Sequence, residues 1–285
     1  MAESAAESQE DMAPASASLR FADVLCAVDG SEGGFVAVGQ AASLAGSEGH
    51  LTLLLVTSFD VDGERRGPAI GTAEATRIVN RATEVARDAG VRSTVEVDPA
   101  TPPARVILDW SVNRDLLALG APTTPRLRAM FTSGVADTAL GSFTTPLLAV
   151  RSMPDQHEIG HRMIVASDGR EGSDQLVDVG QRLARERGGE MILLHAAGHE
   201  SHARLERVEE QGRRLQLTGG PSELRVEHGS AHDVIAATAE SVGASLVLMG
   251  SRRLDGLRAI GSVSRRVVHE APCSVLLVPP ERLSG

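Results

Sequence analysis

The sequence contains no lysine, and its 28 basic residues are all arginine. This absence excludes a lysine nucleophile and the phosphate-binding lysine of a Walker loop. Aromatic residues make up only 2% of the chain, so they provide no platform on which nucleic-acid bases could stack. A net charge of −10 also opposes association with nucleic acid and with anionic membranes. We therefore expect binding neither to nucleic acid nor to a membrane.

Cysteine and long hydrophobic runs are also scarce. Cys26 and Cys273 each lie within an apolar segment, where a thiol usually packs as a small hydrophobic group, and two such residues form no disulfide framework. Hydrophobic runs stay shorter than the roughly 18 residues of a membrane helix. Residues 1–19 are acidic, unlike a signal peptide, and their composition predicts a disordered tail. These features indicate a cytoplasmic protein.

What the sequence does have is an internal repeat. The segment 23–56, DVLCAVDGSEGGFVAVGQAASLAGSEGHLTLLLV, reappears as 162–196, RMIVASDGREGSDQLVDVGQRLARERGGEMILLHA. Each copy reads as an apolar strand, an Asp-Gly turn, an amphipathic stretch, a glycine-rich break and a second strand. The ends of the copies match as well, which predicts domains at 20–151 and 161–280 with a polar linker at 152–160.

Near-continuous runs of Val, Leu, Ile and Ala predict strands buried on both faces, joined by crossover helices in a parallel sheet. We expect the fold class to be α/β, with two tandem doubly wound five-stranded parallel-sheet domains. In copy two the predicted strands are 163–167, 191–196, 223–227, 245–249 and 274–278, and the predicted helices are 172–187, 200–216, 231–242 and 262–269. Ligands of such sheets bind at the carboxyl ends of the strands, where Asp29, Gly120, Asp168 and Gly250 fall.

Three segments carry a resemblance to a known family: AVDGS after the first strand, LVLMGSR at the fourth, and GSVSRRVVHEAPCSVLLVP near the end. From Phe21 to Pro280 the chain resembles a tandem universal stress protein. The resemblance implies a nucleotide-binding, α/β hydrolase-like architecture whose first-strand aspartate meets the ribose and adenine of ATP, ADP or AMP. It also implies a role in the stress response through a protein partner that the sequence does not identify. The last strands, PLLAV and SVLLV, are expected to pair, so that the copies form an intrachain pseudo-dimer. The sequence does not decide whether two chains also form a homodimer.

The phosphate motif of that family is Gly, two residues, Gly, nine residues, then Gly-Ser or Gly-Thr, and this chain departs from it in both copies. In copy two Arg253 replaces the second glycine, and seven residues separate it from Gly261. In copy one the nine-residue spacing is kept, but Thr123 replaces the glycine and the final pair is inverted as Ser133-Gly134. An arginine can replace amide contacts with a charge-assisted contact to phosphate. The candidate nucleotide-binding residues are Asp168, Ala196, Gly250, Arg253, Gly261, Ser262, Val263 and Ser264 in copy two, and Asp29, Val56, Gly120 and Gly134 in copy one.

Four of these residues also have a purely structural interpretation. Asp29 and Asp168 precede glycine in turns, where aspartate commonly caps a helix, and Ser262 and Ser264 suit a helix N-terminus. The histidines at 195, 199 and 202 have no carboxylate at a metal-ligand spacing, so no metal site is expected. No acid–base pair for catalysis stands out.

We therefore expect a non-catalytic, adenine-nucleotide-binding stress regulator. Copy two should hold the better site, with AMP or ADP bound at least as well as ATP. The alternative is a nucleotide-free scaffold that kept the fold and lost the ligand.

Overall fold

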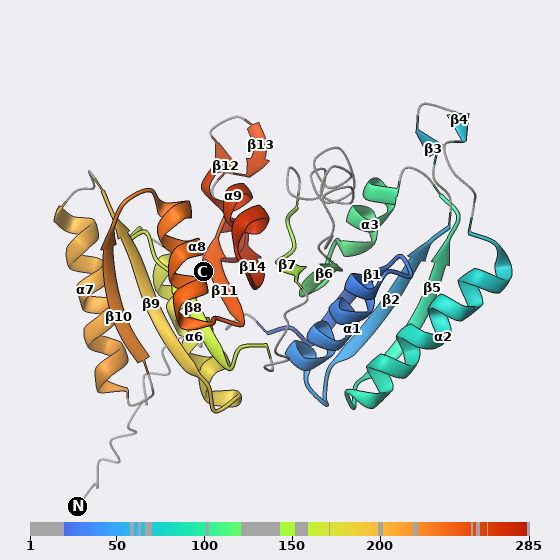
Figure 1. The fold of residues 1–285 in the computed structure, drawn as a ribbon, viewed down its shortest axis with the longest axis horizontal. Helices are drawn as coiled ribbons and strands as arrows, with labels where there is room; N and C mark the ends of the chain where they lie inside the picture. Colours follow the sequence, from blue (N-terminus) through green and yellow to red (C-terminus); the bar gives the residue numbers. More distant parts are fainter. Residues whose placement is uncertain are drawn as a thin grey trace, which may run out of the picture.

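The computed structural model describes residues 20–57, 60–61, 64–65, 70–100, 103–120, 143–151, 159–170, 172–198, 202–218, 222–251, 253–254, 257–260 and 262–283. Ten strands form one sheet in the order β10-β9-β8-β11-β14-β7-β6-β1-β2-β5, with copy two on the left of Figure 1 and copy one on the right. The strands of copy one are β1 (Asp23–Val28), β2 (His50–Val56), β5 (Arg92–Asp98), β6 (Leu116–Gly120) and β7 (Leu147–Val150). Those of copy two are β8 (Arg162–Ala166), β9 (Glu190–Ala197), β10 (Ser222–His228), β11 (Leu246–Gly250) and β14 (Ser274–Val278).

Within each copy all neighbouring strands are parallel, and the order reverses beside the first strand, as in a doubly wound fold. One face is covered by α1 (Glu32–Ala45), α2 (Thr72–Asp88), α6 (Ser173–Glu186) and α7 (His202–Leu217). The other face is covered by α3 (Pro103–Ser111), α8 (Ala231–Val242) and α9 (Ser262–Glu270). The expected fold class of two doubly wound five-stranded domains is confirmed.

The hydrophobic strands are continuous in sequence because both faces of the sheet are buried. Along β1, Val24 and Cys26 belong to the core under α1 and α2, whereas Leu25 between them belongs to the core under α3. All three are fully buried. Since successive strand residues point to opposite faces, a strand with a core on each side needs apolar residues at every position.

The two copies join through their last strands. β14 pairs with β7 in antiparallel register, with Leu276 opposite Leu148. Beside this junction, the buried Ser274 hydroxyl donates to Gln40 Oε1 of copy one at 2.7 Å. Arg151, the residue after β7, donates to the carbonyls of Val268 and His269 at the end of α9, each at 2.9 Å. The expected intrachain pseudo-dimer is confirmed, and its sheet is continuous across the junction.

The predicted elements of copy two agree with the observed ones to within two residues at each end. Two short hairpins were not predicted: β3 (Asp60–Val61) with β4 (Glu64–Arg65), and β12 (Arg253–Leu254) with β13 (Leu257–Ile260). The second lies between the predicted strand 245–249 and the predicted helix 262–269, where no element was expected. In both hairpins the two intervening residues are Asp-Gly in the sequence, a pair typical of hairpins, so the signal was present.

Several expectations lie outside the described residues, namely the tail 1–19 and residues 152–158 of the expected linker. Ile159, also placed in that linker, is buried in the core.

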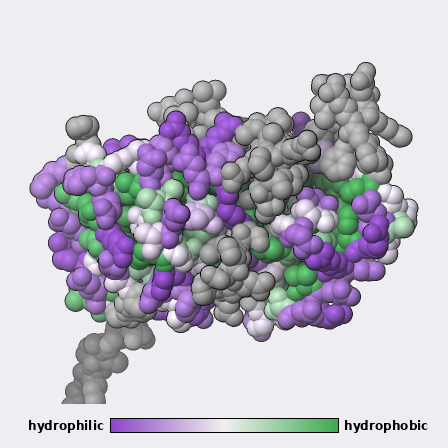
Figure 2. Space-filling model, viewed as in Figure 1, coloured by the Kyte–Doolittle hydropathy of each residue, from purple (hydrophilic) through white to green (hydrophobic). Residues whose placement is uncertain are grey.

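In the part of the chain that the structure describes, no helix is both long enough and apolar enough to cross a membrane. On the face drawn in Figure 2, hydrophobic colour is divided among several separate areas with hydrophilic residues between them.

Candidate functional site

In copy two, Asp168 lies in the turn that follows β8, at the carboxyl edge of the sheet. Its Oδ1 accepts a hydrogen bond from the Arg170 backbone N–H at 3.1 Å, and its Oδ2 lies 3.5 Å from Arg170 Nε. The Asp168 side chain is 36% exposed, so its carboxylate can be reached from solvent. The structure thus adds Arg170, a cation beside Asp168, which the sequence analysis did not include in the site.

The corresponding carboxylate in copy one, Asp29, is part of a helix cap. Asp29 Oδ1 accepts hydrogen bonds from the Ser31 N–H at 2.9 Å and from the Ser31 hydroxyl at 2.6 Å. Ser31 is the N-cap of α1, and its Oγ accepts from the Gly34 N–H at 3.0 Å. Such side chains are favoured there because they satisfy amide groups that the helix leaves unpaired. Asp29 therefore has the structural role that the sequence left open, and copy two, with Arg170 in place of Ser31, lacks this cap.

A buried polar network supports the Asp168 turn in copy two. The Ser167 hydroxyl donates to Gln211 Oε1 at 2.8 Å, and Gln211 Nε2 donates to Ser173 Oγ at 2.9 Å and to Asp174 Oδ1 at 2.7 Å. Ser167, Ser173 and Gln211 are each at most 5% exposed. A satisfied network of this kind fixes side-chain positions in a core.

Copy one has hydrophobic packing in the corresponding place. By the repeat, Val28 stands at the position of Ser167 and Phe35 at that of Asp174, and both pack in the core on that face. The two copies therefore support their first-strand turns differently, by polar contacts in copy two and by apolar contacts in copy one.

The remaining strand-end residues also lie at the carboxyl edge. Gly250 and Gly120 end β11 and β6, Val56 ends β2, and Ala196 is the penultimate residue of β9. Val56 is buried and Ala196 is half-buried. Because β8 pairs directly with β11, the Asp168 turn and Gly250 lie at the carboxyl ends of adjacent strands. We call the carboxyl ends of β8 and β11 the switch point of copy two.

Of the two serines at the start of α9, Ser264 contacts this switch point, whereas Ser262 points to solvent. Ser264 is only 3% exposed, and its hydroxyl lies 3.4 Å from the Gly250 carbonyl, to which it donates. Ser262, the first residue of α9, is exposed, and Val263 is half-buried. Ser264 thus attaches α9 to the end of β11, which leaves Ser262 and the first amide groups of the helix as the accessible donors.

The segment between β11 and α9 forms a hairpin in which Arg253 pairs with Ile260 and Leu254 with Leu257. Arg253, which replaces the second glycine of the phosphate motif, is therefore held in a strand. Backbone groups that pair with each other in a hairpin are not available to a phosphate. Of the other predicted residues, Gly261 and Gly134 lie outside the described residues.

The histidines considered in the sequence analysis have other roles where they are described. His195 is buried, and its Nδ1 lies 2.8 Å from the Ser167 carbonyl, while His202 Nε2 lies 3.2 Å from Glu206 on the surface of α7. His199 lies outside the described residues.

A different group, His232, Asp233 and Glu270, has ligand atoms within 4.8 Å of one another. His232 Nε2 lies 3.1 Å from the Arg266 guanidinium, which would repel a cation bound to that nitrogen. We therefore assign no metal to this group.

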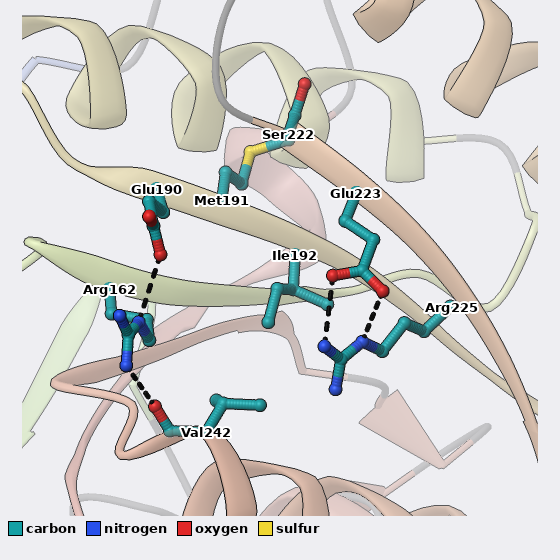
Figure 3. Close-up of a pocket in the computed structure, with 8 residues that line it drawn as sticks. All are labelled: Arg162, Glu190, Met191, Ile192, Ser222, Glu223, Arg225 and Val242. Carbon is teal, nitrogen blue, oxygen red and sulfur yellow. Dashed lines mark hydrogen bonds and ion pairs between the residues drawn. The ribbon is translucent and has the colours of Figure 1, made fainter.

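A surface pocket of about 450 Å³ lies at the opposite edge of copy two (Figure 3). Arg162 and Glu190, the first residues of β8 and β9, pair across it at 3.1 Å, and Arg225 pairs with Glu223 at 2.7 Å. Each arginine in the pocket is thus neutralised by a carboxylate. The pocket lies at the amino ends of the strands, away from Asp168 and Gly250, and it is not part of the candidate site.

Comparisons with known proteins agree with this architecture. The model of the universal stress protein family matches residues 20–151 and again residues 160–279. A curated universal stress protein of Thermus aquaticus is 30% identical over 132 residues, which is 41% of this chain and 96% of that protein.

Two solved structures share the fold over most of the chain. A universal stress protein of Archaeoglobus fulgidus DSM 4304 has a TM-score of 0.76 at 21% identity, covering 92% of this chain and 98% of its own. A second, from Pseudomonas aeruginosa UCBPP-PA14, has a TM-score of 0.65 at 16% identity, covering 93% and 95%. With two family matches that together span most of its length, the chain belongs to the universal stress protein family, as two fused copies of the domain.

Proposed function

We propose that copy two binds an adenine nucleotide at its switch point, and that the protein acts in the cytoplasm as a stress-response regulator by binding, without turnover. The observation that carries the proposal is the arrangement of three groups on adjacent elements: the accessible Asp168 carboxylate after β8, Gly250 at the end of β11, and the exposed start of α9 at Ser262. Doubly wound sheets bind ligands at such switch points, and a helix N-terminus favours an anion.

The roles follow from the chemistry of each group. The Asp168 carboxylate can accept hydrogen bonds from ribose hydroxyls, and Gly250 has no side chain to obstruct a sugar. Ser262 and the first amides of α9 can donate to one phosphate group. Because Arg253 and Leu254 pair with Ile260 and Leu257 in a hairpin, these residues offer few amides to further phosphates. We therefore propose that AMP or ADP binds at least as well as ATP.

Calorimetric titration with AMP tests the site. We expect Asp168→Ala to weaken binding by roughly tenfold or more, since a hydrogen bond to a charged group contributes about 1.5–3 kcal/mol. Ser262→Ala should weaken it by a smaller factor, because a helix terminus contributes about 0.3–1 kcal/mol to anion binding at an exposed site. Asp29→Ala is the matched control: it removes the equivalent residue of copy one, which holds the α1 cap residue Ser31, and should leave affinity unchanged. Loss of binding in Asp29→Ala with full binding in Asp168→Ala would show that the nucleotide binds in copy one, and the proposal would be wrong.

We also propose that the protein does not hydrolyse ATP. The chain has no lysine to stabilise a transferred phosphoryl group, and the Asp168 carboxylate is paired with Arg170. Phosphate release from ATP should therefore stay at the background rate with and without Mg²⁺. A steady rate that scales with protein concentration and disappears in Asp168→Ala would refute this.

The hairpin also supports a second candidate, a scaffold that has lost its ligand. In that case Ser262 serves only as the start of α9, and the parent protein gives no binding heat with AMP, ADP or ATP at millimolar concentration.

A further inference from the structure

After β14 the chain turns back over the end of its own sheet. Residues 279–283 contain a short 3-10 helix (Pro280–Arg282) with hydrogen bonds from the Arg282 N–H to the Pro279 carbonyl and from the Leu283 N–H to the Pro280 carbonyl, both at 3.0 Å. The Ser251 N–H donates to the Val278 carbonyl at 2.9 Å, which holds the start of this segment beside the end of β11. We call residues 279–283 the strap.

Leu283 of the strap lies between Gly172, at the start of α6, and Gly250, at the switch point of copy two. A methyl group built on Gly172, the N-cap of α6, would lie 3.3 Å from Leu283 Cβ. A methyl group built on Gly250 would lie 3.3 Å from Leu176 Cδ1 of α6 and 3.5 Å from Leu283 Cδ1. Leu283 is half-buried and packs against the hydrophobic core beneath α6. Its side chain thus lies between the start of α6 and the end of β11, at the carboxyl edge of the sheet, where a ligand of this sheet is expected.

Copy one has no leucine-sized space at the corresponding place. A methyl group built on Gly120, which ends β6, would lie 2.6 Å from the Gly33 carbonyl group and 2.8 Å from the Gly34 nitrogen. The first turn of α1 therefore contacts the end of β6 directly. In copy two the side chain of Leu283 lies between Gly172 at the start of α6 and Gly250 at the end of β11, so its withdrawal would leave room between these two glycines.

The strap is attached to copy one as well as to copy two. Arg282 Nη2 donates to the Arg114 carbonyl at 3.1 Å, and Arg114 itself pairs with Asp23 at 2.6 Å. Because the two sheets meet in antiparallel register, the carboxyl edge of copy two lies beside the amino edge of copy one. Arg282 is exposed, and its hydrogen bond to Arg114 joins the strap to the other copy.

We propose that the strap is an autoinhibitory element: Leu283 and the nucleotide compete for the space between Gly172 and Gly250, and the Arg282–Arg114 contact stabilises the closed position. The proposal rests on the nucleotide-binding function proposed above and adds a means of regulating it. If the binding-competent state is only fractionally populated, the apparent affinity falls by that fraction. Changes in copy one that break the contact at Arg114 then raise the affinity of copy two.

Titration calorimetry with AMP on the parent protein and on Leu283→Ala tests the strap. Removing most of a half-buried leucine side chain should weaken closure enough to raise AMP affinity by roughly tenfold. Arg282→Ala, which removes one hydrogen bond at the far end of the strap, should raise it by a smaller factor of about threefold. Leu217→Ala removes a leucine that is 86% exposed on α7, and this matched control should bind AMP like the parent.

The outcomes separate the strap from the function on which it rests. Tighter binding in Leu283→Ala that is lost in Leu283→Ala/Asp168→Ala supports both, including when the parent itself gives no heat. Equal or weaker binding in Leu283→Ala, with measurable binding in the parent, overturns the strap and leaves nucleotide binding in place. No heat in either protein overturns both.

Discussion

Replacing Leu276 with proline is expected to lower the melting temperature by roughly 10 °C or more and to loosen the contact between the copies. Leu276 is fully buried in β14, which pairs with β11 on one side and with β7 on the other. Proline removes a ladder hydrogen bond and a buried side chain, at a cost of about 4 kcal/mol or more. In a chain of this size each kcal/mol corresponds to about 2–4 °C.

Leu276→Ala separates the two causes, because alanine loses the packing but keeps the N–H group. The proline variant should therefore melt several degrees below the alanine variant. Limited trypsin digestion provides a second measurement: Arg151 follows β7 and is held by two carbonyls of α9, so cleavage there should accelerate when the β14–β7 pair is weakened. Leu148→Pro, on the opposing strand, should behave in the same way. If both proline variants melt like Leu276→Ala and trypsin releases the halves no faster, the junction does not hold the copies together.

The sequence predicted the architecture because the repeat and the hydrophobic runs are local patterns. Strands such as β11 and β14 are apolar at nearly every position, which only a sheet covered on both faces requires. The junction between β14 and β7 was predicted from the family resemblance together with the apolar character of both strands. The register of the β14–β7 pair could not be predicted, because several registers would bury these strands equally well.

The candidate site was only partly predictable. The sequence placed Asp168 and the start of α9 correctly, but it treated Ser262 and Ser264 as equivalent donors. Residues two apart on a helix do not share a face, and the structure accordingly exposes Ser262 and turns Ser264 towards Gly250. The position of each serine depends on how α9 is rotated against the sheet, which two residues alone do not determine.

Other features of the site depend on contacts between residues distant in sequence. Gln211 bonds Ser167 and Ser173, which precede it by 44 and 38 residues. A glutamine within the charged helix α7 resembles an ordinary surface residue until the packing of α7 on α6 is known. Leu283 likewise reads as part of a polar end segment, and only the tertiary structure places it beside Gly172 and Gly250.

The second large effect is a loss of folding stability at alkaline pH, and the amino-acid composition limits which side chains can cause it. The sequence has neither tyrosine nor lysine, so the thiols of Cys26 and Cys273 are the side chains that ordinarily titrate between about pH 8 and pH 11. Both thiols are free and buried. Burial raises the pKa of Cys26 to about 12, with a further contribution from the negative charge of Asp29. Burial likewise raises the pKa of Cys273 to about 12, although nearby Arg151 acts in the opposite direction.

Folding stability should therefore be nearly constant up to about pH 8 and should fall between about pH 8 and pH 12, from the unfolded thiol pKa range to the raised native one. In this range the unfolded chain releases its thiol protons while the native protein retains them, so rising pH favours unfolding, by roughly 1 kcal/mol per pH unit for each thiol. Urea unfolding at pH 8, 9, 10 and 11 measures the decline, and absorbance of the thiolate near 240 nm follows ionisation without interference from tyrosinate. Cys26→Ala/Cys273→Ala is the control, because it retains every other titrating group and should show a nearly flat profile over the same range. An equally steep decline in this double variant would mean that the alkaline sensitivity has another origin and that the buried thiols do not contribute to it.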